Sequence, residues 1–400
     1  MFSLFLCNRN ETKFNSFVIV ILPNIKYNLY YKIKENGFIM SIEKDLKKDG
    51  ITIISPIDTL TINSLAKYVS EQISSTYSSC GIKKDTLFRK ISRMSMSYAD
   101  IPEGFSEASY FYKNQTIYFK NGISEKDMKK YAIHECIHHI QEVRDDNNNL
   151  LKMGLADYKK RPKGIALNEA AVQTISSNIL NNDKELVTYY GIDFETNSPY
   201  IYPILCNLLS QISFFIGEDT LIKSTFSGND DFTNKMLEIF GKQNYKTILS
   251  NLDIILNTEE KIILNENKLL SDDLAINSSK TKKLAEKSRH YKEKIKETYF
   301  KTQELLMNSY FNYEISNISS KESGENFRTK LYQYKNYIGT YEGYAFYNEF
   351  YIDMMKKLDI KFENIGTSIY LVPTTDNKFI KILNAIKNFF KLKFNKELSE

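Results

Sequence analysis

The string His134-Glu135-Cys136-Ile137-His138 constrains this chain more than any other feature of its sequence. Apolar residues recur around it with the spacing of an α-helix, and residues four apart on a helix share one face. The imidazoles of His134 and His138 can therefore bind the same Zn²⁺ ion. Glu135 is then placed to hold a metal-bound water and to take its proton. The spacing predicts a zinc site with Glu135 as general base.

A catalytic zinc site needs three protein ligands and one open position, so a third ligand must come from elsewhere in the chain. The sequence has only 4 histidines, and His139 lies too far round the helix from His134 to join the same ion, which predicts a packing role for it. A carboxylate is therefore expected. We predict Glu169, because it lies on a second, alanine-lined helix where a buried glutamate needs a partner. Three other glutamates stay open as substitutes: Glu107, Glu142 and Glu185.

The two motifs together resemble those of the gluzincins, the thermolysin-like branch of the zinc metallopeptidases. In that family His-Glu-x-x-His lies on one helix and a ligand glutamate, often within an Asn-Glu-Ala string, lies on the next. Here the second string is Asn168-Glu169-Ala170. The resemblance is specific over about 124–180 and architectural over about 51–256. It implies a zincin-like fold, metal ligands at His134, His138 and Glu169, and Glu135 as general base.

The same resemblance assigns roles around the site. It implies that Ala108–Tyr112 is the sheet edge above the cleft, where a peptide adds by β-augmentation. Gln173 stands where thermolysin has an aspartate that orients a ligand histidine, so weaker zinc binding is expected. His290 is expected to be an exposed residue, with oxyanion stabilisation as its alternative. The predicted outer contacts of the site are Asn168 and Gln173, and the predicted substrate contacts are Ala108, Ser109 and Tyr110.

The composition is that of an ordinary globular protein. Of 400 residues, 42% are hydrophobic and 26% charged, which is enough apolar material for one large domain or two smaller ones. A net charge of +5 is mild at this length, and we expect no nucleic-acid partner. Scattered cysteines predict reduced thiols and a cytoplasmic location. Phe17–Leu22 is too short to span a membrane, and a secretory signal within residues 1–39 is the minority alternative.

Hydrophobic periodicity and turn residues predict the local elements. Strands are predicted at Ile51–Pro56, Met94–Ile101, Ser109–Tyr112 and Thr116–Lys120, the last two as a hairpin. Helices are predicted at Leu60–Tyr77, from Ser124 to a turn at Asp145–Asn149, at Ala166–Leu180, and from Ser198-Pro199 to Gly217. Further helices are predicted up to Gly241, at Tyr245–Leu256, and along Glu259–Ser309 and Tyr310–Tyr351, with a loop at Ser319–Asn326.

These elements predict an α+β protein in three parts: an N-terminal extension over 1–39, a zincin-like metallopeptidase domain over 40–257 and a mainly helical region over 258–400. The domain should contain a small mixed or antiparallel sheet with an edge strand over the motif helix. In Lys378–Phe394, lysines alternate with apolar residues. We expect a terminal helix docked on its own domain, with contact to a membrane surface as the alternative.

The sequence thus predicts a zinc metalloendopeptidase of gluzincin type that binds one Zn²⁺ per chain and hydrolyses a peptide or protein substrate through a Glu-assisted metal-bound water. Three alternatives stay open. The first is a regulatory gluzincin that cleaves one dedicated protein partner. The second is a catalytically inactive zincin-fold binding protein, and the third is a secreted, toxin-like protease.

Overall fold

The computed structural model describes residue 46 and residues 50–101, 106–271, 279–338 and 341–364. Its small sheets and many helices confirm the predicted α+β class and the helix-rich C-terminal half. The predicted extension over 1–39 and the segment Lys378–Phe394 lie outside the described residues. Within the described part of the chain, no helix combines the length and the apolarity that crossing a membrane demands.

The main sheet has four strands and carries the edge predicted near the site. Its order is β1 (Thr52–Pro56), β2 (Ser95–Asp100), β4 (Thr116–Lys120) and β3 (Ala108–Phe111). Strands β2 and β4 run parallel, and the other two pairings are antiparallel. The sheet is therefore mixed, and the predicted hairpin of β3 and β4 is confirmed, with β3 at the edge.

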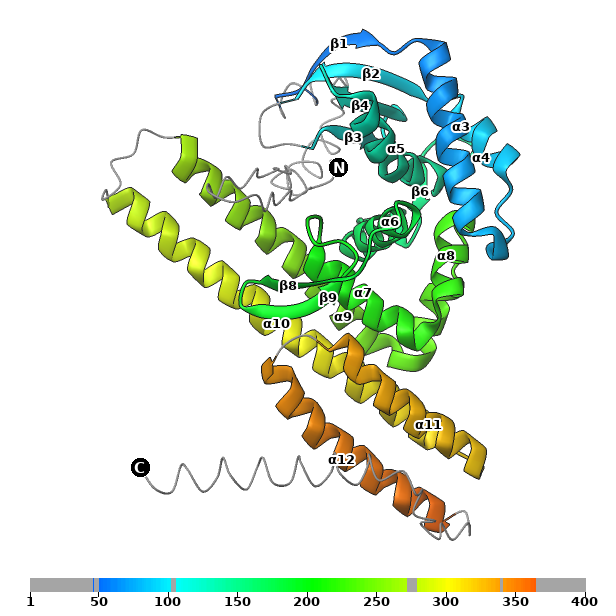
Figure 1. The fold of residues 1–400 in the computed structure, drawn as a ribbon, viewed down its shortest axis with the longest axis vertical. Coiled ribbons are helices and arrows are strands. Elements are labelled where there is room, and N and C mark those ends of the chain that lie inside the picture. The colour runs from blue at the N-terminus through cyan, green and yellow to red at the C-terminus, as the bar shows by residue number, and fades with distance from the viewer. Residues whose placement is uncertain (1–45, 47–49, 102–105, 272–278, 339–340, 365–400) are drawn as a thin grey trace.

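Helix α5 (Glu125–Ile140) packs against this sheet, and α3 (Thr59–Thr76) and α4 (Lys84–Ile91) pack against each other and against α5. The predicted start of the motif helix is confirmed, because the backbone N–H of Asp127 donates to the Ser124 hydroxyl at 3.1 Å. Val69 of α3, Ile117 of β4 and Ile133 of α5 belong to one buried apolar cluster. This cluster fixes α5 beneath the sheet (Figure 1).

The connection between the two motif helices contains strands that the sequence did not predict. Helix α5 ends at Ile140, earlier than the turn predicted at Asp145–Asn149. A three-stranded sheet follows, and it leads into α6, the predicted second motif helix. Its strands are β5 (Glu142–Arg144), β6 (Leu150–Met153) and β7 (Ala156–Asp157), and α6 spans Ile165–Ile179.

After α6 comes a hairpin of β8 (Glu185–Tyr189) and β9 (Ile192–Thr196), then α7 (Pro203–Ile216) and α8 (Glu218–Ser227). The prediction that a helix begins at Ser198-Pro199 is wrong, because α7 begins at Pro203. Ser198 does not cap a helix. Its hydroxyl donates to the carbonyl of Ile201, and this bond holds a loop in place of a first helical turn.

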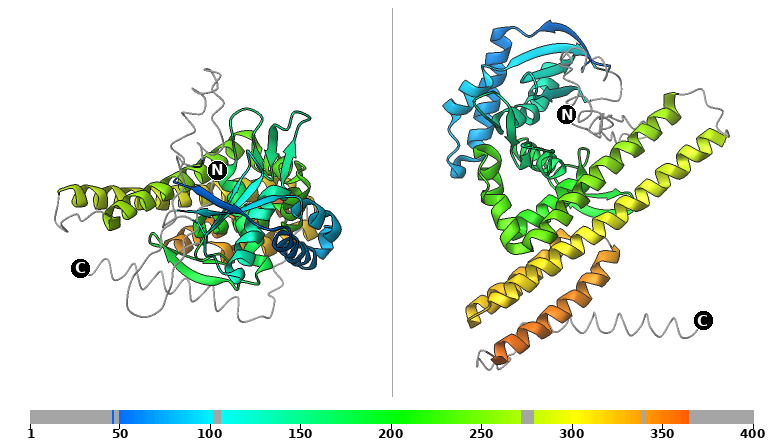
Figure 2. Two further views of the ribbon diagram at one scale, coloured as in Figure 1. Left: turned by 90° about the horizontal axis from the view of Figure 1, so that it is seen from above. Right: turned by 180° about the vertical axis from the view of Figure 1, so that it is seen from behind.

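The described part of the C-terminal half contains α9 (Asp231–Ser271), α10 (Ser279–Asn317), α11 (Lys321–Tyr334) and α12 (Tyr341–Asn364). Helices α9 and α10 pack along each other as a long hairpin that extends beyond the rest of the fold (Figures 1 and 2). Gly241, at φ 73°, breaks α9 where a helix end was predicted. The predicted loop at Ser319–Asn326 is wrong from Lys321 onwards, because Ser320 caps α11 there.

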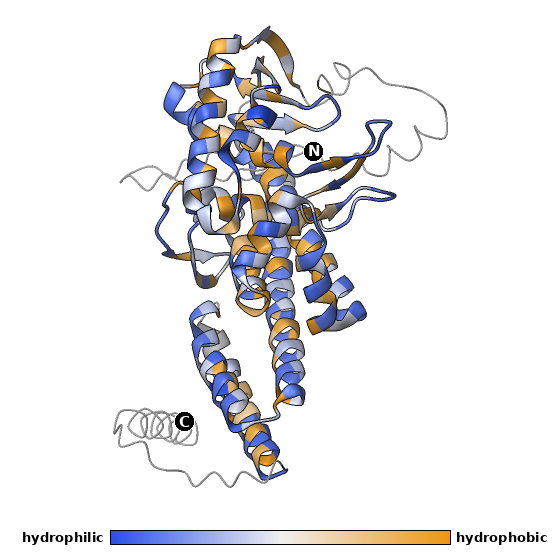
Figure 3. Ribbon diagram, turned by 90° about the vertical axis from the view of Figure 1, so that its right-hand side faces the viewer, coloured by the Kyte–Doolittle hydropathy of each residue, from blue (hydrophilic) through white to orange (hydrophobic). Residues whose placement is uncertain are grey.

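A second buried cluster joins the helical half to α6. It includes Leu167 of α6, Leu208 of α7, Ile255 of α9 and Tyr299 of α10. Figure 3 shows that hydrophilic residues prevail in the loops between the strands, while hydrophilic and apolar stretches alternate along the helices. Helix α6 belongs to both clusters, because Leu167 lies in the cluster of the helical half and Val172 lies in the cluster beneath the sheet.

Candidate metal centre

Helices α5 and α6 bring three potential metal ligands together in the interior. His134, His138 and Glu169 are 2%, 3% and 2% exposed. The Nε2 atoms of the two histidines lie 3.1 Å apart. The Oε2 atom of Glu169 lies 3.8 Å from His134 Nε2 and 3.6 Å from His138 Nε2. Three donor atoms thus face one point.

The donor set fits a metal ion. A tetrahedral zinc ion with bonds of about 2.0–2.1 Å separates its ligand atoms by ~3.3 Å, close to the observed spacings. Two imidazole nitrogens and one carboxylate oxygen are also donors that zinc accepts. Among the described residues this is the one group of three or more His, Cys, Asp and Glu side chains that could hold a metal ion.

Small and branched residues place α6 in the interior. Ala166, Ala170 and Ala171 are fully buried in the cluster that α6 shares with the helical half. Val172 and Ile175 belong instead to the cluster that contains Ile133 of α5. The first turn of α6 lacks a capping side chain of its own, since Gly164 precedes it. Asp253 of α9 supplies the missing acceptor, because Ala166 N–H donates to its Oδ1 at 3.3 Å.

The charge of Glu169 is stabilised by its neighbours. Burial alone raises the pKa of a carboxyl group, but the imidazoles of His138 and His134 outweigh that effect at Glu169. They hold its pKa well below its usual range. A carboxylate that stays ionised in the interior is suited to metal binding, because only the deprotonated form is a good ligand.

Glu135 lies beside the first histidine but makes a different set of contacts. The backbone N–H of Tyr110 on β3 donates to its Oε2 at 2.7 Å. Its Oε1 is buried and has no hydrogen-bond partner in the described part of the chain. Burial raises the pKa of Glu135 to about 7, against the opposing effect of His134, and the nearby Glu169 adds to the rise. One oxygen is therefore anchored, and the other is left for a further proton or hydrogen-bond donor.

Two side chains outside the triad were predicted to support it. Gln173 contacts a predicted ligand directly, because its Oε1 lies 3.0 Å from His134 Nδ1. Asn168 instead joins α6 to the preceding turn: its Oδ1 accepts from Leu155 N–H at 3.0 Å, and its Nδ2 donates to Gln141 at 3.2 Å. Gln141 ends α5, so this amide pair links the two motif helices.

The predicted substrate strand lies next to Glu135. Ala108, Ser109 and Tyr110 are at most 3% exposed on β3. Substrate binding by these residues stays a prediction. At the far end of the strand, Arg144 donates to the carbonyl of Tyr112 at 2.5 Å and forms a two-point ion pair with Glu142.

The other candidates lie in separate places. Glu107 pairs with Lys120, and Glu185 is exposed on β8. His139 contacts the Tyr110 hydroxyl through its Nδ1, at 3.1 Å, and burial lowers its pKa to about 4. His290 is exposed on α10. The described cysteines, Cys80, Cys136 and Cys206, are free thiols.

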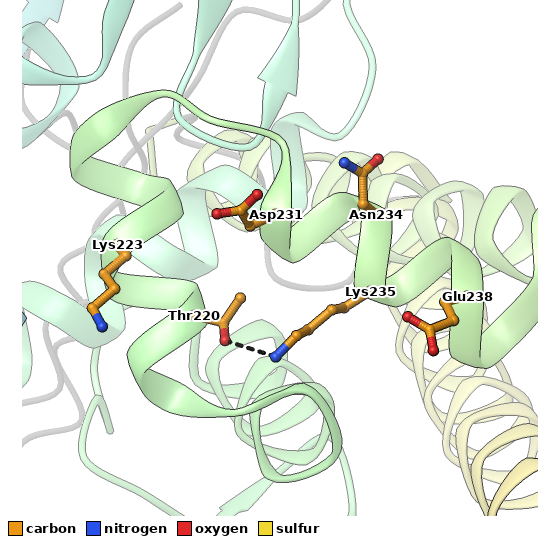
Figure 4. Close-up of a pocket in the computed structure, with 6 residues that line it drawn as sticks. All are labelled: Thr220, Lys223, Asp231, Asn234, Lys235 and Glu238. Atoms are coloured by element: carbon orange, nitrogen blue, oxygen red, sulfur yellow. Dashed lines mark hydrogen bonds between the residues drawn. The ribbon is translucent and has the colours of Figure 1, made fainter.

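A polar surface pocket lies between α8 and α9, and none of its residues belongs to the triad (Figure 4). Lys235 crosses it and donates to the Thr220 hydroxyl at 3.3 Å. The remaining lining residues are Lys223, Asp231, Asn234 and Glu238.

Sequence reasoning missed three contacts at the centre. The bond from Tyr110 N–H to Glu135 involves the backbone and leaves no trace in residue types. Ser177 and Ser198 both lie against the amide of Gln173. The sequence predicted Ser198 to be a helix cap. Nothing in the sequence indicated that its hydroxyl would instead contact Gln173, 25 residues earlier in the chain.

Compared with family models, curated proteins and solved structures, the chain matches none of them.

Proposed function

We propose that this protein is a zinc-dependent metallopeptidase in which His134, His138 and Glu169 hold one Zn²⁺ ion. Three protein ligands leave one position for water or substrate, as in catalytic zinc sites. When bound, the zinc ion acts as a Lewis acid toward the scissile carbonyl and the attacking water. Proton transfer and substrate positioning are the roles of residues that lie around the triad.

The position of Glu135 is the observation that carries the proposal. Its Oε2 is held by the N–H of Tyr110, while its buried Oε1 has no partner in the described part of the chain. A pKa raised to about 7 lets a carboxylate take a proton and return it near neutral pH. Glu135 is thus suited to accept the proton of the attacking water and to pass it to the leaving nitrogen.

The substrate in this proposal is a peptide or protein segment in extended conformation. Strand β3 ends the sheet and lies against α5, so a peptide added to it would run past Glu135. Ala108, Ser109 and Tyr110 are the proposed substrate contacts. The outward carbonyls of Ala108 and Tyr110 would accept hydrogen bonds from that peptide, because the N–H of Ala108 donates to Ser106 Oγ and that of Tyr110 donates to Glu135. We place the protein in the cytoplasm, because Cys80, Cys136 and Cys206 are free thiols.

Metal content and hydrolysis test the proposal together. We expect about one zinc per wild-type chain by mass spectrometry and a sharp reduction in Glu169→Ala. Glu135→Gln should keep the zinc and lose hydrolysis of unfolded casein. Glu125→Gln is the matched control, because Glu125 lies on the same helix in an exposed ion pair with Lys129.

Three outcomes would redirect the proposal. Stoichiometric zinc in Glu169→Ala removes that residue from the site. Unchanged turnover in Glu135→Gln removes the base. Stoichiometric zinc in the wild-type protein without hydrolysis of casein or of any candidate partner favours a zinc-binding protein without peptidase activity.

A further inference from the structure

The amide of Gln173 lies between the metal centre and two serine hydroxyls. Its Oε1 faces His134 Nδ1 at 3.0 Å. Its Nε2 donates to the hydroxyl of Ser177 at 3.1 Å and to that of Ser198 at 3.0 Å. Gln173, Ser177 and Ser198 are 5%, 0% and 2% exposed, so bulk water does not compete for these bonds.

A backbone carbonyl determines the direction of the whole chain of bonds. Ser198 Oγ lies 2.5 Å from the carbonyl oxygen of Ile201, which can only accept, so the single hydroxyl proton of Ser198 is used there. Ser198 can then only accept from Gln173, which must present its Nε2 to the serine. The Oε1 of Gln173 must face His134.

The orientation of Gln173 selects the tautomer of His134. Because Oε1 can only accept, Nδ1 of the neutral imidazole must carry the proton. The lone pair is then on Nε2, the atom that lies 3.1 Å from His138 Nε2 and 3.8 Å from Glu169 Oε2. A rotated amide would place a donor against the Nδ1 proton and favour the tautomer that cannot bind metal through Nε2.

We propose that Ser177 and Ser198 are positioning residues of the metal centre, which hold the amide of Gln173 in the one orientation that keeps His134 in its metal-binding tautomer. The inference rests on the proposed metal site. It assigns a function to the loop between β9 and α7, which contains Ser198 and Ile201 and contacts neither histidine in any hydrogen bond described above.

The first test reads the tautomer directly and needs no metal. In zinc-free protein labelled with ¹⁵N-histidine, at a pH where His134 is neutral, we expect the Nδ1–H form. The signal is assigned by its loss in His134→Asn. Ser198→Ala should shift the signal toward the Nε2–H form. A wild-type Nε2–H tautomer would overturn the inference, even if that protein goes on to bind zinc.

The second test is a double-mutant cycle on zinc affinity, measured by chelator competition. We expect Ser198→Ala to weaken zinc binding by about tenfold, the lower end for an outer partner of a ligand histidine. Gln173→Glu replaces the amide by a carboxylate, which accepts through either oxygen. In that background Ser198→Ala should change zinc affinity by less than ~2-fold, because no orientation is left to select.

Ser176→Ala is the matched control for Ser177→Ala. Ser176 is also buried on α6, but its hydroxyl donates to the Val172 carbonyl, whereas the hydroxyls that accept from Gln173 are those of Ser177 and Ser198. Only Ser177→Ala should weaken zinc binding. Equal losses from Ser198→Ala in both backgrounds, or no loss in either, would contradict the inference. Absence of zinc from the wild-type protein would instead refute the proposed function, whereas the tautomer test would keep its meaning.

Discussion

Tyr110 and Glu135 join the edge of the sheet to the motif helix through a single hydrogen bond, from a backbone N–H to a buried carboxylate oxygen, 2.7 Å long. Lys120 N–H donates to the carbonyl of Glu107, so the backbone groups of Glu107, Ser109 and Phe111 face β4. The N–H of Tyr110 therefore points away from β4, at the free edge of the sheet. The strand therefore helps to set both the position and the protonation of Glu135.

Replacing Tyr110 by proline would remove this donor. The N–H lowers the pKa of Glu135, so its loss should raise that pKa further and move the rise of hydrolysis with pH to higher pH. Tyr110→Ala is the control, because it removes the side chain and keeps the N–H. Profiles of kcat/KM against pH would measure the effect. Identical shifts in both variants would mean that the ring, not the backbone donor, controls Glu135.

The backbone of Gly154 lies against the hydrogen-bonded side-chain amides of Asn168 and Gln141. A Cβ atom there would come within 2.2 Å of Asn168 Oδ1 and 2.6 Å of Gln141 Nε2, at a φ of +54°. We expect Gly154→Ala to destabilise the fold by roughly 2–4 kcal/mol and to weaken metal binding. Gly122→Ala provides the backbone control, since Gly122 has φ +80° and no neighbour within 4 Å. Chemical denaturation would show whether Gly154→Ala costs more.

Glu259 should make stability depend on pH. It is 2% exposed on α9, and burial raises its pKa to about 8, with a further rise from Glu260. The folded state thus retains a proton that the unfolded chain releases near the ordinary glutamate pKa. Stability should fall as pH rises from about 4.5 to about 8 and then level off.

Glu259→Gln should remove that dependence and stabilise the protein at pH 8 by roughly 1–4 kcal/mol. Thermal unfolding at pH 5 and pH 8 would measure it. Glu266→Gln on the same helix is the control, because Glu266 forms a partly exposed ion pair with Lys292 and should contribute little. A pH slope that persists in Glu259→Gln would assign it to another group.

Asp253 should stabilise the start of the helix that carries Glu169. Its Oδ1 accepts the N–H of Ala166, one of the unpaired donors in the first turn of α6. We expect Asp253→Ala to cost about 1 kcal/mol of unfolding free energy and to weaken metal binding, whereas Asp253→Asn keeps an acceptor and should retain most of both. Equal losses in the two variants would indicate a role for the charge instead.

The sequence predicted those parts of the site that depend on spacing within one helix. His134 and His138 share a face because they are four residues apart, and the Ser124 cap predicted where their helix begins. Glu169 was predictable because a glutamate among buried alanines needs a partner. These signals are local, and local structure is what residue patterns encode most directly.

Contacts between distant segments were less predictable. Ser198 followed by Pro199 has the pattern of a helix start, but the bond to Ile201 holds a loop there and turns the hydroxyl toward α6. Strands β5 to β7 are 2 to 4 residues long, too short for a periodic signal. Ser320 caps a helix inside the predicted loop, because a serine-rich stretch predicts turns and helix caps equally well.

The hydrogen bond from Arg144 to the Tyr112 carbonyl limits the length of the sheet edge with which another chain can pair. Tyr112 follows Tyr110 at the next outward position, and the guanidinium already satisfies its oxygen. A strand that joined β3 would meet a Tyr110 N–H that donates to Glu135 and a Tyr112 carbonyl that accepts from Arg144, so few main-chain groups would be left for pairing. Such short backbone pairing would give little sequence selectivity. Any preference among substrate sequences would have to come from side-chain contacts on either side of the paired segment.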